Sequence, residues 1–75
     1  MGKLPQIAGR TIVAAFEKQG YRAVRQRGSH IRLLPPDGVN RKPLTIPDHH
    51  VVGKGLLRKI IRDAGLSVDE FLKLF

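Results

Sequence analysis

Apolar residues at helical spacing mark both ends of the chain. Near the N-terminus, Ile12, Val13 and Phe16 share one side of a helix that the spacing predicts over about residues 9–19. Toward the C-terminus, a longer apolar stripe predicts a second helix with a basic opposite side. That stripe comprises Leu56, Leu57, Ile60, Ile61 and Ala64.

Glycine and serine residues predict where the helices end and begin. Gly20 fits the left-handed position that follows a helix, with Tyr21 placed to pack back on Phe16, and Gly65 repeats the signal. Ser67, followed three residues later by Glu70, is a capping-box pattern. It predicts a last short helix over residues 68–75. We expect this helix to contribute three side chains to the core, those of Phe71, Leu72 and Phe75.

Between the helices, the pattern predicts three short strands. The first two, at about residues 21–26 and 29–34, are close enough to form a hairpin around Arg27-Gly28. The third, at about residues 43–46, is bounded by Pro43 and Pro47, which is typical of an edge strand or of a strand that stops abruptly. We therefore expect one α+β domain over residues 1–75, an α-β-β-β-α sandwich with helices on one sheet face and the other face open.

Composition is that of one small globular domain. The 75 residues are 41% hydrophobic and 27% charged. There is neither an apolar run of about 20 residues for a membrane span nor a signal-like N-terminus, so we expect a cytoplasmic protein without membrane contact. The absence of cysteine excludes disulfides and thiolate chemistry.

The charge balance indicates that the protein binds a polyanionic partner. Fourteen Lys and Arg residues against six Asp and Glu residues give a net charge of +8. Nucleic acid is the commonest partner of such a surface, although an acidic protein fits equally well. Aromatic residues make up only 5% of the chain, which favours recognition of the phosphate backbone over base stacking. The candidate phosphate contacts are Arg25, Arg27, Arg32, Lys54 and Arg58.

His30 is the candidate catalyst. Strand alternation places His30 and Arg32 on the face opposite Ile31 and Leu33. Histidine can exchange a proton with a ribose hydroxyl at cellular pH, and nearby guanidinium groups would stabilise a phosphorane-like transition state. A lone strand histidine is more often a surface residue, so the residues by themselves leave both interpretations open.

His49 and His50 invite a metal hypothesis together with Asp48. Adjacent residues of an extended segment point to opposite sides, and cysteine is absent, so we expect no metal and no other cofactor. The carboxylates are also too scattered for a two-metal nuclease. Either histidine is expected instead to cap the second helix or to contact phosphate.

Three segments together resemble the HicA toxin family. They are Gly28-Ser29-His30, Thr45-Ile46-Pro47-Asp48-His49-His50 and the stretch from Gly55 to Phe71. The resemblance implies a fold similar to a double-stranded-RNA-binding domain, in the order helix, three strands, helix. It also implies an mRNA interferase, an endoribonuclease of a type II toxin–antitoxin system that a HicB-type antitoxin neutralises. The family's catalytic histidine corresponds to His30, and its turn to Gly28 and Ser29.

The mechanism that we expect is metal-independent attack by the ribose 2′-hydroxyl with His30 as base. One histidine cannot serve two oxygens at once, so water, Ser29, Arg32 or His50 would complete the proton transfers. A non-catalytic RNA-binding module with the same basic face is the main alternative. A DNA-binding role for the second helix is weaker, because its basic side carries no Asn or Gln to read bases.

Overall fold

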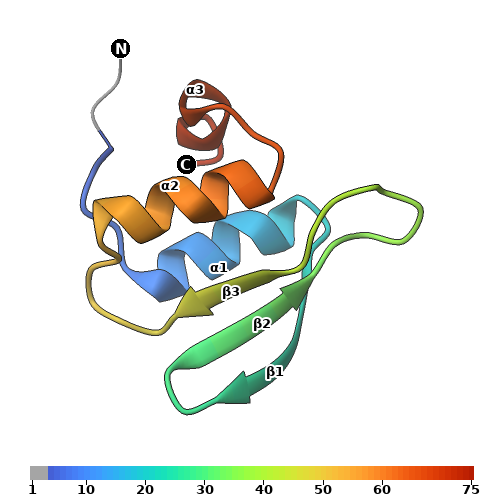
Figure 1. The fold of residues 1–75 in the computed structure, drawn as a ribbon, viewed down its shortest axis with the longest axis horizontal. Helices are drawn as coiled ribbons and strands as arrows, with labels where there is room; N and C mark the ends of the chain where they lie inside the picture. The colour runs from blue at the N-terminus through green and yellow to red at the C-terminus, as the bar shows by residue number, and fades with distance from the viewer. Residues whose placement is uncertain (1–3) are drawn as a thin grey trace.

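Helices cover one face of a three-stranded sheet, and no helix of the described residues covers the other (Figure 1). The computed structural model describes residues 4–75. The elements are α1 (Gly9–Lys18), β1 (Arg22–Arg27), β2 (His30–Leu34), β3 (Leu44–Pro47), α2 (Lys54–Asp63) and α3 (Val68–Leu72). This confirms the predicted α+β class, and the order up to α2 is the one that the resemblance implies. Within residues 4–75, no helix is long and apolar enough to cross a membrane.

The sheet is antiparallel, with β2 between β1 and β3. Ile31 and Leu33 of β2 are buried beneath the helices, whereas His30 is exposed on the opposite face. The alternation of β2 is thus confirmed. β3 is an edge strand, as its flanking prolines predict.

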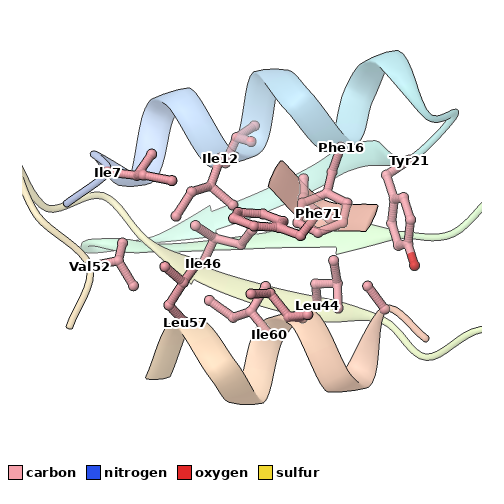
Figure 2. Packing of buried hydrophobic residues seen from close by; sticks show 14 of the residues in the cluster. Ile7, Ile12, Phe16, Tyr21, Leu44, Ile46, Val52, Leu57, Ile60 and Phe71 are labelled. Atoms are coloured by element: carbon pink, nitrogen blue, oxygen red, sulfur yellow. The ribbon is translucent and has the colours of Figure 1, made fainter. Parts of the chain in front are cut away.

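One core joins all the elements except β1. Figure 2 shows side chains of α1 and α2 meeting around Phe71 of α3. The Phe16 ring lies 5.3 Å from the Tyr21 ring and 6.0 Å from the Phe71 ring, measured between centroids. The fully buried large side chains are Phe16, Phe71, Ile12, Leu33, Leu44, Ile46 and Leu57.

The predicted caps at Gly20 and Ser67 are confirmed, but the last helix ends at Leu72 and not at Phe75. Gly20 has a φ of 96°, and the Tyr21 N–H donates to the Phe16 carbonyl at 3.1 Å, as in a Schellman motif. Ser67 and Glu70 form the reciprocal capping box, in which the Ser67 N–H donates to Glu70 Oε1 at 2.8 Å. This bond from the backbone lowers the pKa of Glu70.

Helix α1 begins in close contact with the end of β3. The Gly9 N–H donates to the His49 carbonyl at 2.9 Å. A Cβ atom at Gly9 would overlap the Pro47 carbonyl group. The approach of helix and strand therefore requires glycine at this position.

Two predicted core residues are exposed, and a third, Leu72, is only partly buried. Phe75 is 54% exposed because α3 ends at Leu72, so its ring only covers Phe71, with centroids 5.1 Å apart. Leu56 is 42% exposed, and it lines a hollow that opens between α2 and β3. Both predictions followed helical periodicity, which gives the direction of a side chain but not what lies above it.

The boundaries of the hairpin differ by one residue from the prediction. The turn consists of Gly28 and Ser29, with Arg27 and His30 paired across it. Gly28 has a φ of 59°, as expected for glycine at the first central position of a type II′ turn. Tyr21, predicted as the first strand residue, precedes β1 and takes part in the Schellman motif that follows α1.

Candidate nucleic-acid interface

An extra residue in β1 decides which way its arginines point. Ala23 pairs with Leu33, and Arg25 pairs with Arg32, so Val24 stands between them without a partner on β2, a β-bulge. In a regular strand, Arg25 would share the side of Ala23, whose partner Leu33 is buried. The bulge shifts the alternation and turns Arg25 to the open face.

Cross-strand neighbours then gather cations around His30. Arg27 lies opposite His30, and Arg25 lies opposite Arg32. Arg32 Nη1 also donates to Thr45 Oγ1 on β3 at 3.3 Å. These five side chains line an open hollow of about 250 Å³ on the uncovered face of the sheet.

The electrostatics of this hollow favour an anion. Like charges directly opposite each other on a sheet are destabilising, and Arg25 and Arg32 form such a pair. A phosphate group between them would replace repulsion with charge-assisted hydrogen bonds. The imidazole of His30 lines the same hollow.

A hydrogen-bonded clamp holds the turn that precedes His30. Gln26 Nε2 donates to the Gly28 carbonyl at 3.0 Å, and the Asp48 N–H donates to the Ser29 carbonyl at 2.6 Å. Arg10 Nη2 of α1 donates to Gln26 Oε1 at 3.2 Å and to Asp48 Oδ2 at 3.0 Å. One guanidinium group thus joins both residues that hold the turn.

A second hollow, of about 240 Å³, opens between β3 and α2 and shares His30 and Arg32 with the first. On its α2 side lie Leu56, Lys59 and Asp63. Lys59 Nζ donates to Asp63 Oδ2 at 2.8 Å, and this bond lowers the pKa of Asp63. The remaining lining residues are Pro43, Leu44, Thr45, Pro47 and Ile60.

The structure brings only part of the predicted site together. Gly28, Ser29, Arg25, Arg27 and Arg32 surround His30, but Lys54 and Arg58 line neither hollow at His30. Arg58 is two residues from Leu56, about 200° around the helix. It lines a different hollow, where α2 meets the segment that leads to α3.

His49 and His50 are exposed in the connection from β3 to α2. The expectation that one of them caps α2 is wrong, because Gly53 occupies the N-cap position. Neither histidine lines a hollow that contains His30. Within residues 4–75, no three His, Asp or Glu side chains are grouped as metal ligands.

Comparison with known families decides the classification. The model of the family described as HicA toxin of bacterial toxin–antitoxin matches residues 9–66. The chain belongs to the HicA toxin family. The match covers both hollows and the turn at His30, so these features lie in the part of the chain that is typical of HicA toxins. Neither the curated proteins nor the solved structures gave a match.

Sequence reasoning missed three contributors to the surroundings of His30. Arg10 and Asp48 are 38 positions apart, and Thr45 reaches Arg32 across the sheet. The bulge at Val24 left no recognisable turn or glycine signal in the sequence. These contacts depend on strand register, which local patterns do not specify here.

Proposed function

We propose that this HicA toxin is a metal-independent endoribonuclease that cleaves mRNA in the cytoplasm, with His30 as its catalytic residue. The observation that supports the proposal is the hollow on the open sheet face, where His30 meets three arginines. Gly28 and Ser29 form the turn that presents His30, and Arg25, Arg27 and Arg32 bind the phosphates. Contacts of Lys54 and Arg58 with RNA farther along the strand are part of the same proposal.

In the proposed reaction, His30 accepts the proton of a ribose 2′-hydroxyl. The 2′-oxygen forms a bond to phosphorus while the bond from phosphorus to the 5′-oxygen breaks. The products are a 2′,3′-cyclic phosphate and a 5′-hydroxyl, and water that reaches the open hollow protonates the leaving oxygen. The arginines stabilise the charge that builds up on the phosphate oxygens.

Cleavage of a long single-stranded RNA in the presence of EDTA tests this proposal. We expect wild type to cut, and His30→Ala to bind RNA but cut about 100-fold to 10,000-fold more slowly, the range of general acid–base catalysis. His50→Ala is the matched control, since it removes an exposed histidine outside the hollow and should cut like wild type. Equal cutting by His30→Ala would refute the role of His30.

A substrate with a 2′-deoxyribose at the cut site tests the nucleophile. We expect it to bind and to resist cleavage, because it lacks the attacking hydroxyl. Cleavage of this substrate would exclude the 2′-hydroxyl mechanism. Binding of RNA by both wild type and His30→Ala without any cutting would favour the alternative, a non-catalytic RNA-binding module.

A toxin of a toxin–antitoxin pair requires an antitoxin, and we propose a HicB-type protein that covers the basic face around His30. The charge of +8 supports an acidic partner surface. Such a complex should protect the amides of β1 and β2 from hydrogen exchange. Protection confined to α3 would contradict this placement.

A further inference from the structure

The hollow between β3 and α2 differs in chemistry from the arginine-lined hollow beside it. Its walls include the side chains of Pro47, Leu56 and Ile60. Leu56 is 42% exposed although it lies on the apolar side of α2. Beside the proposed RNA-binding face, this leucine offers a surface on which an apolar part of a ligand can pack.

The enclosed carboxylate of Asp63 makes the α2 side of this hollow less suited to a phosphate than the arginine-lined hollow is. The side chain of Asp63 is only 19% exposed, whereas that of its partner Lys59 is 61% exposed. The carboxylate is therefore the more enclosed member, and Lys59 reaches toward solvent. A carboxylate repels phosphate but accepts hydrogen bonds from N–H groups.

A nucleobase fits both the apolar wall of this hollow and its hydrogen-bond-accepting carboxylate. Its faces are apolar enough to pack on Leu56 and Pro47, and its edge carries N–H donors. The volume of about 240 Å³ lies below the range of about 300–1,000 Å³ for drug-sized ligands, which suits one planar ring system. His30 and Arg32 border both hollows, so one RNA strand can place a phosphate in one and the adjoining base in the other.

We propose that the hollow between β3 and α2 binds the base next to the phosphate at His30, and that Asp63 favours bases with an exocyclic amino group. This inference rests on the proposed function. The ionised Asp63 only accepts hydrogen bonds, so it pairs with the amino group of cytosine, whereas the corresponding carbonyl of uracil would set a second acceptor against the carboxylate. The site therefore contributes sequence preference to a surface that otherwise holds phosphates.

Binding of 2′-O-methyl trinucleotides tests the site without any cleavage. The trinucleotides carry cytidine, uridine or an abasic unit at the central position, and NMR follows the methyl groups of Leu56 and Ile60 and the amide of His30. We expect cytidine to shift all three signals and to bind about tenfold more tightly than uridine. The abasic trinucleotide should shift the His30 signal alone.

Two variants and a control test which side chains bind the base and which one distinguishes cytidine from uridine. Leu56→Ala should weaken the cytidine trinucleotide several-fold, whereas Val51→Ala, which removes a 49% exposed apolar side chain outside the hollow, should not. Asp63→Asn should reduce the preference for cytidine over uridine to about twofold or less. An unchanged preference in Asp63→Asn would overturn the role of Asp63.

The outcomes separate this inference from the proposed function. If RNA shifts His30 but leaves the Leu56 and Ile60 methyl groups unmoved, the base site is refuted and the phosphate site stands. If the abasic trinucleotide shifts the methyl groups as much as cytidine does, the hollow does not bind a base. If no trinucleotide shifts His30, the proposed RNA site itself fails.

Discussion

The side chain of His30 points to solvent because its neighbours in β2 are anchored on the other face. Ile31 is 3% exposed and Leu33 is fully buried, so the period of two along the strand leaves His30 no other direction. The turn before it is held equally firmly, through carbonyl groups that accept hydrogen bonds from Gln26 and Asp48. A histidine fixed in this way fits the proposed role, which requires little reorganisation when a phosphodiester binds.

Gly9 gives the clearest stability prediction for a single residue. Gly9→Ala places a methyl group against the backbone of Pro47, which cannot yield as a flexible side chain would. We expect a loss of about 1–3 kcal/mol or more in the free energy of unfolding, measured by urea titration.

Gly55→Ala is the matched control for Gly9→Ala. It makes the same change inside α2, where the new Cβ would meet no atom within 4 Å apart from its chain neighbours and the backbone of its own helix. There alanine should stabilise the protein by up to about 1 kcal/mol, as its helix propensity predicts. Equal effects of the two substitutions would contradict the close packing of Gly9.

At the scale of elements, helix α1 and the hairpin act together through Arg10. The helix is joined to both sides of the turn by one guanidinium group, with bonds to Gln26 and Asp48. The bulge at Val24 completes the arrangement, because it turns the arginines of β1 toward the same face as His30. The geometry of the site therefore depends on the docking of three elements and not on β2 alone.

Arg10→Ala tests this dependence. The side chain of Arg10 is 62% exposed, and exposed ion pairs contribute only about 0–1 kcal/mol to stability, so the variant should remain folded. We expect RNA cleavage to slow several-fold in kcat, with KM nearly unchanged, because the turn loses its clamp but the phosphate contacts remain.

Lys18→Ala removes another exposed cation from α1 and serves as the control for Arg10→Ala. Its kcat should equal that of wild type. Faster hydrogen exchange at the amides of residues 28–30 in Arg10→Ala would show that the turn has loosened. A kcat for Arg10→Ala equal to wild type would mean that the clamp does not position His30.

The whole molecule carries its charge of +8 unevenly with respect to the proposed site. Arg25, Arg27 and Arg32 meet at one hollow, while Arg58 lies on another side of α2. Net charge attracts RNA from all directions, but only cations that displace counterions from phosphates change the salt dependence of binding. Salt titration can therefore locate the bound strand on the molecule.

Arg32→Ala and Arg58→Ala each remove one positive charge. They therefore compare the hollow at His30 with the side of α2 that carries Arg58. For single strands, each phosphate contact contributes about 0.7 to the slope of log Kobs against log salt concentration. We expect each variant to lower the slope by about that amount, because the proposed strand runs from the hollow at Arg32 to Arg58 on the far side of α2. An unchanged slope in Arg58→Ala would confine the bound strand to the hollows at His30.

Local signals in the sequence determined the elements, their caps and the outward direction of His30. Capping residues act within a few positions, so Gly20, Gly65 and the Ser67–Glu70 pair predicted helix ends that the structure confirms. The phase of β2 followed from Ile31 and Leu33 in the same way. The family resemblance, too, rested on short segments of sequence.

Only the tertiary structure decided which other groups meet His30. The bulge at Val24, the clamp through Arg10 and the partial exposure of Leu56 arise from pairing and packing between distant segments. Periodicity could not foresee that Phe75 extends past the core or that Arg58 lies away from the open face. The physical reason is that a local pattern gives the direction of a side chain, whereas its surroundings depend on which distant segments pack against it.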